Sequence, residues 1–203
     1  MKINIVNNTD LEIAVNKSED GIITLTIDDA KKNEKLLGDV KPGEIVKLGE
    51  REYIVLGHDA ETTVVITNDT VKDMEFGKTG DYLTSNVRKY CNGEFYNELV
   101  AAVGAENIVK HTVKLVADDG TGKGKTCCDN VSIITTENYR RYREFLKADR
   151  EEWWTATSVA FDKGYLYGVR CVNHDGVLYG ENCGFRRGVR PFCILNSSIP
   201  LSD

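Results

Sequence analysis

Two stretches of alternating residues near the end of the chain constrain its fold more than any other feature. Trp153 to Ser158 and Gly188 to Leu195 mix aromatic, small and β-branched residues, a pattern typical of strands buried in a core. Between them lies a segment rich in glycine and tyrosine, residues 158–188, which we call the insert. We therefore expect two core strands that hold an exposed insert, an arrangement more typical of recognition than of catalysis.

The rest of the pattern predicts strands on both sides of a helical middle. A helix is expected over 85–104, broken at Asn92-Gly93, and a second one after a Thr135 or Thr136 cap. This order of elements predicts an α+β fold. The other expected strands are 45–48, 53–56 and 63–67, a pair formed by 113–117 and 131–135, and then 165–172, 177–179 and 189–195.

The first residues form a pattern of their own. Alternation over 1–28, interrupted by two polar turns, predicts a three-stranded antiparallel unit that includes Ile3 and Ile5. A polar run follows it, so we expect an N-terminal β unit over 1–30 and a larger domain over 37–203. The small unit could attach the domain to an assembly, or form a homo-oligomer through its strands.

Length and composition are typical of a soluble globular protein. The chain has 203 residues, 41% of them hydrophobic, which is enough to bury a core. No window approaches the roughly 18 apolar residues of a membrane span, and Met1 to Asn8 lacks the apolar core of a signal peptide. We expect no membrane insertion and a protein that is cytoplasmic when made. The net charge of -6 argues against nucleic acid as the main partner.

The cysteines and glycines offer several chemical alternatives. Without a signal peptide, the six cysteines are expected to be reduced; if disulfides form, Cys183 with Cys193 or Cys171 with Cys183 are the expected pairs. Gly120 to Thr126 has the composition of a phosphate loop, but Asp119 stands where the first glycine belongs, so a surface loop is favoured.

No cofactor is expected. There is no Cys-x-x-Cys pattern, and each histidine is more simply explained as a surface or hydrogen-bonded residue. Asn173, Asp175 and Glu181 could supply oxygens to Ca²⁺, but Asn173 to Gly176 is also an ordinary hairpin turn, which we favour. No nucleophile-elbow pattern occurs, which leaves no catalytic residue to name.

The insert carries the candidate binding residues. Rigid amphipathic rings and adaptable hydrogen-bonding groups are typical of binding loops. An equal alternative is that Tyr165 and Tyr167, two residues apart, only line one face of a strand. Arg190, which precedes a proline in a strand pattern, is expected to be structural rather than part of an anion site with Phe185, Arg186 and Arg187. The candidates are Ser158, Phe161, Tyr165, Tyr167, His174, Tyr179, Asn182 and Arg186.

An ordered set of motifs resembles an uncharacterised domain family of gut Firmicutes and their phages. The closing half is similar to the C-type-lectin-like fold of formylglycine-generating enzymes and of receptor-binding proteins diversified by retroelements. The resemblance covers about residues 37 to 195, and it implies a scaffold of two strands with a ligand-binding surface on the insert. The motifs are Leu37 to Gly43, Tyr53 to Leu56, Ser85 to Arg88, Trp154 to Ser158, Asp175-Gly176 and Gly188 to Pro191.

Two functional hypotheses follow. The first is a non-catalytic binding module that recognises a protein or glycan, as a virion-associated decoration or receptor-binding protein of a phage or prophage. The second is an intracellular phage effector that docks to a host defence protein and inhibits it. The oxidase activity of the formylglycine-generating branch is disfavoured, because that branch needs two cysteines a few residues apart, whereas Cys183 and Cys193 are farther apart.

Overall fold

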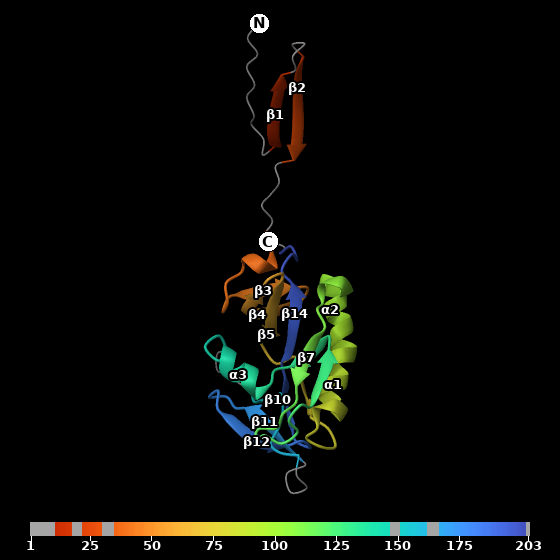
Figure 1. The fold of residues 1–203 in the computed structure, drawn as a ribbon, viewed down its shortest axis with the longest axis vertical. Coiled ribbons are helices and arrows are strands. Elements are labelled where there is room, and N and C mark those ends of the chain that lie inside the picture. The colour runs from red at the N-terminus through yellow and green to blue at the C-terminus, as the bar shows by residue number, and fades with distance from the viewer. Residues whose placement is uncertain (1–10, 18–21, 30–34, 147–150, 162–166, 202–203) are drawn as a thin grey trace. The chain divides into compact units, whose positions relative to one another are not determined.

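The computed structural model describes residues 11–17, 22–29, 35–146, 151–161 and 167–201 (Figure 1). The chain divides into two compact units, residues 1–35 and residues 36–201, which are described separately. The second unit contains both hydrophobic clusters of the described residues.

The described part of the first unit is a β-hairpin. Strand β1 (Leu11–Lys17) pairs antiparallel with β2 (Ile23–Asp29), and Val15 stands opposite Leu25. Two of the three expected strands are therefore observed. The expected strand around Ile3 and Ile5 lies outside the described residues.

The second unit is built on two five-stranded sheets among the described residues, and its fold is α+β with mostly antiparallel pairing. Sheet A has the order β12-β11-β10-β13-β6, and sheet B has the order β3-β4-β5-β14-β9. The strands of sheet A are β12 (Leu178–Asn182), β11 (Gly168–Val172), β10 (Trp153–Ser158), β13 (Arg186–Val189) and β6 (Lys72–Glu75). Those of sheet B are β3 (Ile45–Leu48), β4 (Arg51–Asp59), β5 (Thr62–Thr67), β14 (Pro191–Asn196) and β9 (Val131–Ile133).

The predicted single strand over 189–195 is two strands in different sheets. Strand β13 pairs in parallel with β10 in sheet A, whereas β14 lies between β5 and β9 in sheet B. Pro191 lies at the junction, where its missing N–H and fixed φ end the first ladder. Arg190, between them, is buried; it donates to the carbonyls of Thr67 and Asn68 and lies over the ring of Trp153. The prediction that Arg190 is structural is confirmed in its carbonyl contacts.

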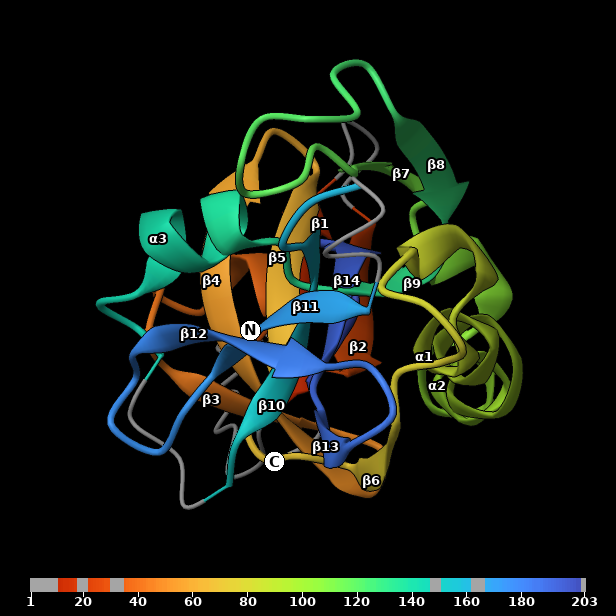
Figure 2. The ribbon, with the colours of Figure 1, turned by 90° about the horizontal axis from the view of Figure 1, so that it is seen from below.

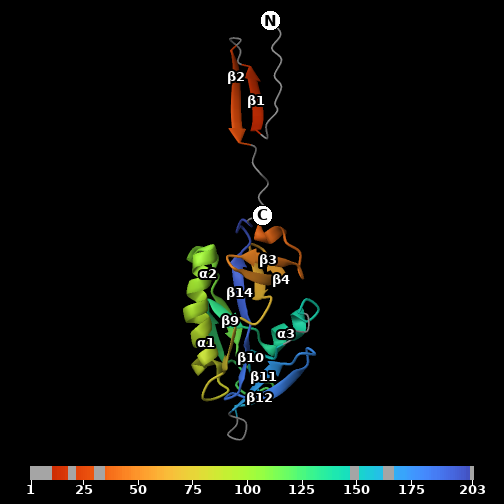
Figure 3. The ribbon, with the colours of Figure 1, turned by 180° about the vertical axis from the view of Figure 1, so that it is seen from behind.

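Helices cover two sides of the unit (Figures 1 and 3). On one side α1 (Asn86–Tyr90), a π-helical turn (Cys91–Phe95) and α2 (Tyr96–Val103) follow one another directly. The π turn falls at the predicted break, Asn92-Gly93. On the other side α3 (Thr136–Tyr142) is capped as predicted, with the Thr135 hydroxyl accepting from the Asn138 N–H at 3.2 Å. Short 3₁₀ turns occur at Leu37–Asp39, Tyr82–Thr84 and Ala105–Asn107.

A two-stranded ribbon corrects another prediction. Strand β7 (His111–Lys114) pairs with β8 (Thr126–Asp129), not with the segment after Val131. That segment, β9, is fully buried beside β14. Strand β8 was missed because the sequence Thr-Cys-Cys-Asp lacks the apolar alternation on which strand prediction depends.

Strand β10 is shared by both hydrophobic clusters. Successive side chains of a strand point to opposite faces, so Trp153 and Trp154 enter different clusters. Trp153 packs edge-on against Tyr139 of α3 with ring centroids 5.6 Å apart, and Trp154 packs against Phe76 at 5.4 Å. The two tryptophans thus join α3 and the loop after β6 to the same strand.

The ends of the second unit meet. Leu36 forms a β-bridge with Pro200, and the Leu37 N–H donates to the Ile199 carbonyl at 2.8 Å. In Figure 1 this junction lies at the end of the unit that carries β3, whereas β11 and β12 lie at the other end.

Candidate functional site

Four segments meet at the end of the second unit that carries β11 and β12. Figure 2 shows the molecule from this end. They are the loop 77–85, the loop 117–125, the described part of the insert that follows β10, and the turn 182–186. We call this surface the insert end. Its parts come from distant stretches of sequence, so its formation depends on the whole fold of the second unit.

Hydrogen bonds between the segments hold the insert end together. The Ser158 hydroxyl donates to the Gly80 carbonyl at 2.6 Å, and the Ser158 carbonyl accepts from the Asp118 N–H at 2.9 Å. The Phe161 N–H donates to the Thr121 hydroxyl at 3.1 Å. Loops fixed in this way lose less conformational entropy when a partner binds.

The glycine-rich loop supports Phe161 rather than an anion. Lys125 Nζ lies 4.1 Å from the centroid of the Phe161 ring and 2.8 Å from an Asp81 carboxylate oxygen. Gly122 has a φ of +70°, and a Cβ there would lie 2.5 Å from the same ring. The segment that follows is strand β8 and not a helix whose N-terminus could bind a phosphate.

Two aromatic side chains of the insert end are exposed to solvent. Tyr167 is 53% exposed and Phe185 is 57% exposed. The Tyr167 carbonyl accepts from the Cys183 N–H at 2.8 Å, which places Tyr167 and the turn that carries Phe185 at the same end of the β11–β12 hairpin. Lys78 and Lys123 are exposed on the neighbouring loops. The surface combines exposed rings with charged side chains, which include the exposed Asp119 on the same loop as Lys123.

Some predicted residues at the insert end already make hydrogen bonds or ion pairs within the fold. Ser158 is only 3% exposed, and its hydroxyl already donates to the Gly80 carbonyl. The Asn182 side-chain oxygen accepts from the Gly184 N–H at 3.0 Å and shapes the turn. Arg186 pairs with Asp73 of β6 on an exposed face. Tyr165 lies outside the described residues.

Tyr179 belongs to a polar network on sheet A. Its hydroxyl donates to a Glu152 carboxylate oxygen at 2.7 Å and accepts from Arg187 Nε at 3.0 Å. Arg187 also pairs with Glu181. Burial raises the pKa of the Tyr179 phenol, with a smaller opposing effect of the Arg187 hydrogen bond. The geometry favours a structural role for this side chain.

His174 lies at the other end of the hairpin, in the turn between β11 and β12. The Asn173 side-chain oxygen accepts from the N–H groups of Asp175 and Val177, at 3.0 and 2.8 Å, and Gly176 has a φ of +73°. The predicted hairpin turn is confirmed. The three oxygens considered for Ca²⁺ are not brought together, because Asn173 serves the turn and Glu181 pairs with Arg187.

The cysteines, all within the described residues, are free thiols. Burial raises the pKa values of Cys91, Cys171 and Cys193 above their usual range and that of Cys127 to about 12. At neutral pH these four groups are thiols rather than thiolates, and a thiol is a weak nucleophile and a weak metal ligand.

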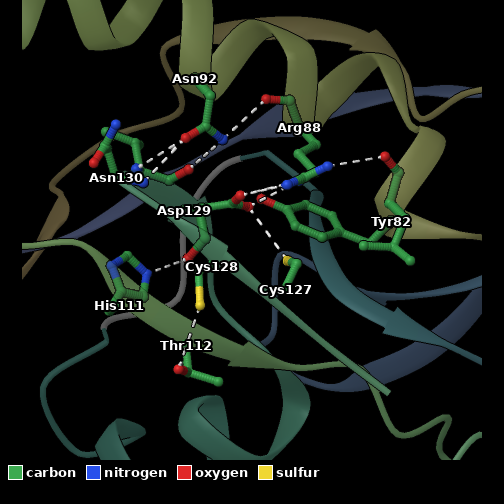
Figure 4. Close-up of polar contacts among 12 residues, drawn as sticks. Tyr82, Arg88, Asn92, His111, Thr112, Cys127, Cys128, Asp129 and Asn130 are labelled. Atoms are coloured by element: carbon green, nitrogen blue, oxygen red, sulfur yellow. Dashed lines mark hydrogen bonds and ion pairs between the residues drawn. The ribbon is translucent and has the colours of Figure 1, made fainter.

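A buried polar cluster joins the ribbon to the helices (Figure 4). The Asp129 carboxylate, which is 2% exposed, accepts from Arg88 Nη2 at 2.7 Å and from the Cys127 thiol at 3.5 Å. The side chain of Asn92 donates to the Val131 carbonyl at 2.8 Å and accepts from the Asn130 N–H at 3.1 Å. These contacts connect α1 and the π turn to β8 and the residues that follow it.

A groove of about 560 Å³ lies over sheet B, between α3 and β7. His58 at its rim has both nitrogens engaged: Nε2 donates to the Val40 carbonyl at 2.7 Å, so Nδ1 accepts from the Thr63 hydroxyl at 3.0 Å. His111 Nε2 lies 2.9 Å from the Ser132 hydroxyl, and burial lowers the His111 pKa. The floor and walls include Val64, Phe192, Ile194, Asn138, Arg141 and Tyr142.

Neither Phe185 nor the two supporting loops are among the binding residues predicted from the sequence. The sequence pattern associates Phe185 only with the arginines that follow it. The sequence signal that could have indicated an exposed ring is a large apolar residue directly after Gly184 in a turn. The contributions of the loops 77–85 and 117–125 depend on tertiary contacts and have no sequence signal.

Comparisons with protein-family models, with curated proteins and with solved structures give no match to this chain. None of the helices among the described residues is long and apolar enough to cross a membrane. The candidate site is therefore inferred from the geometry of this structure alone.

Proposed function

We propose that the protein is a non-catalytic binding module that recognises a protein partner through the insert end. The observation that carries the proposal is the pair of exposed rings, Tyr167 and Phe185, on loops fixed by hydrogen bonds to the fold. Large exposed aromatic side chains on ordered loops are typical of interfaces, where they contribute much of the binding energy.

The chemistry of the surface favours a protein over a glycan. The neighbouring polar side chains Asn182 and Arg186 are already engaged in the turn and with Asp73. A sugar needs several free hydrogen-bonding groups beside a ring, whereas a protein surface is recognised largely by apolar contact and a charged rim. Lys78, Lys123 and the exposed Asp119 supply a charged rim, which suits a partner surface of complementary charge.

We also propose that the second unit is a C-type-lectin-like domain. Several features support this: the ends of the unit meet at Leu36 and Pro200, helices flank two sheets, and the insert lies at the opposite end. A phage or prophage decoration or receptor-binding protein is the setting we propose for such a module.

A display experiment tests the binding proposal. The full chain is used to select from a random peptide library on yeast, and the selected peptides are titrated against the variant Tyr167→Ala/Phe185→Ala. We expect this variant to bind at least about tenfold more weakly, since hot-spot truncations typically cost 2 kcal/mol or more. Its melting temperature should stay near that of the wild type, because both rings are exposed.

The matched control is Ile45→Ala/Val177→Ala. Both side chains are 50% exposed, and Val177 lies at the opposite end of the same hairpin from Tyr167. The control should bind like the wild type. Equal binding by the aromatic variant would overturn the proposed surface. A glycan array that yields ligands while the peptide library yields none would overturn the protein partner.

A further inference from the structure

The N-terminal hairpin has two chemically different faces. Residues directly opposite each other in an antiparallel pair share a face, and so do residues two apart along a strand. The Val15–Leu25 pair therefore shares its face with the positions of Leu11, Ile13, Ile23 and Ile27. The other face has the positions of Glu12, Ala14, Asn16, Thr24, Thr26 and Asp28.

The apolar face is open to solvent where the structure describes its side chains. Val15 is 56% exposed, Leu25 46% and Ile23 48%. A lone two-stranded hairpin is marginally stable in water at best, and it needs a further layer or strand over its hydrophobic face. Contiguous exposed apolar surface of this kind marks an interaction site.

The register places two charged residues at end positions of this face, and these positions indicate what covers it. Lys17 stands beside Ile23 at the turn end of the hairpin, and Asp29 stands opposite Leu11 at the open end. Six residues of strand separate these ends, roughly 20 Å. When a second copy packs on this face with its strands reversed, Lys17 of each copy meets Asp29 of the other. The interface between the two copies is then apolar in the middle and pairs opposite charges at both ends.

We propose that the hairpin is a two-fold dimerisation element, in which the apolar faces of two copies of this chain pack against each other with their strands antiparallel. Such an isologous contact uses the same patch on both copies. The proposal does not depend on the function of the insert end. A dimer would present two insert ends, and the second binding event would become intramolecular.

Sedimentation equilibrium of the full chain tests the proposal. The wild type should have the mass of a dimer. Val15→Lys/Leu25→Lys should weaken dimerisation by about tenfold or more, because it places charges in an apolar interface. The matched control is Asn16→Lys/Thr24→Lys, the neighbouring cross-strand pair on the polar face; it adds the same two charges and should leave the dimer intact.

Charge exchange tests the antiparallel arrangement. Lys17→Asp and Asp29→Lys should each weaken the dimer, and the double variant Lys17→Asp/Asp29→Lys should recover it. Charges roughly 20 Å apart on one hairpin are screened at physiological salt, so recovery can come only from contact between copies. A monomeric wild type, or loss of the dimer in the polar-face control, would overturn the proposal. Failure of the double variant to recover would overturn the antiparallel packing. Peptide binding at the insert end is a separate measurement, so the two proposals can fail separately.

Discussion

At the scale of single residues, Asp129 shows how the ribbon is fixed to the helices. Its carboxylate is nearly fully buried, whereas its partner Arg88 is 30% exposed at the side chain. Removing the arginine therefore leaves a buried charge without its main counter-ion, while removing the carboxylate leaves an arginine that can still reach water.

We expect Arg88→Met to lower the free energy of unfolding by about 3 kcal/mol or more, and Asp129→Asn to lower it by less. The asymmetry arises because only the first variant strands a buried carboxylate. Urea denaturation of both variants and of the double variant would measure it. Equal losses in the two single variants would show that the pair behaves like an exposed ion pair.

His111 gives a pH dependence at the same scale. Burial lowers its pKa below the ordinary value of 6.5. Below pH 6.5 the unfolded chain therefore takes up a proton that the folded chain does not. The contribution of His111 to the free energy of unfolding should be complete above pH 6.5 and should fall as the pH drops toward the lowered pKa. The loss is about 1.4 kcal/mol for each pH unit between 6.5 and the lowered pKa.

The matching variant is His111→Gln, which keeps a polar side chain beside Ser132. We expect its free energy of unfolding to fall less than that of the wild type between pH 7 and pH 5. Denaturant titrations at several pH values provide the measurement. Parallel pH profiles for the two proteins would contradict the assignment to His111.

At the scale of elements, the parallel contact between β10 and β13 depends on a glycine. A Cβ at Gly188 would lie 2.3 Å from Thr70 Cγ2 and 3.2 Å from the Glu152 carbonyl oxygen. We expect Gly188→Ala to lower the free energy of unfolding by about 1–3 kcal/mol, as overpacking does. Adding Thr70→Ala should recover part of this loss, because it removes the nearest atom.

Gly93 in the π turn is the control, since a Cβ there meets nothing within 4 Å. Gly93→Ala should be neutral or stabilising by up to about 1 kcal/mol. Thermal melts of the three variants would separate steric exclusion from a general effect of losing glycine. A Gly188→Ala protein as stable as the wild type would show that the strands move apart at little cost.

The elements also show what the sequence could predict. Local signals placed most strands, the α1–α2 break at Asn92-Gly93 and the cap of α3, because hydrophobic period and capping act over a few residues. Three features were missed: strand β6, the pairing of β7 with β8, and the division at Pro191. Strands β6 and β8 are polar and owe their pairing to neighbours distant in sequence, so their strand character comes from tertiary context.

The candidate site was also predicted only in part from local sequence signals. Tyr167 was predicted from the composition of the insert and is exposed there, whereas Ser158 and Tyr179 are engaged within the fold. Residue type indicated an amphipathic side chain but not its partners. The partners, Gly80 for Ser158 and Glu152 for Tyr179, are set by the packing of distant segments.

At the scale of the whole molecule, the two units should be separable. The hydrophobic clusters of the described residues contain only residues of the second unit, from Leu37 to Leu201. We expect a chain that starts at Leu36 to melt within a few degrees of the full chain and to lose self-association. Calorimetry and sedimentation would test this. A truncated chain without a cooperative transition would show that the second unit needs the hairpin to fold.

The most direct test of the proposed binding function is amide hydrogen exchange of the full chain, with and without a saturating selected peptide. If the insert end is the binding site, the peptide slows exchange in the loops 77–85 and 117–125 and in the turn 182–186. The groove over sheet B provides an internal comparison. Slowed exchange confined to residues 56–64 and 138–142, which line that groove, would contradict a binding site at the insert end.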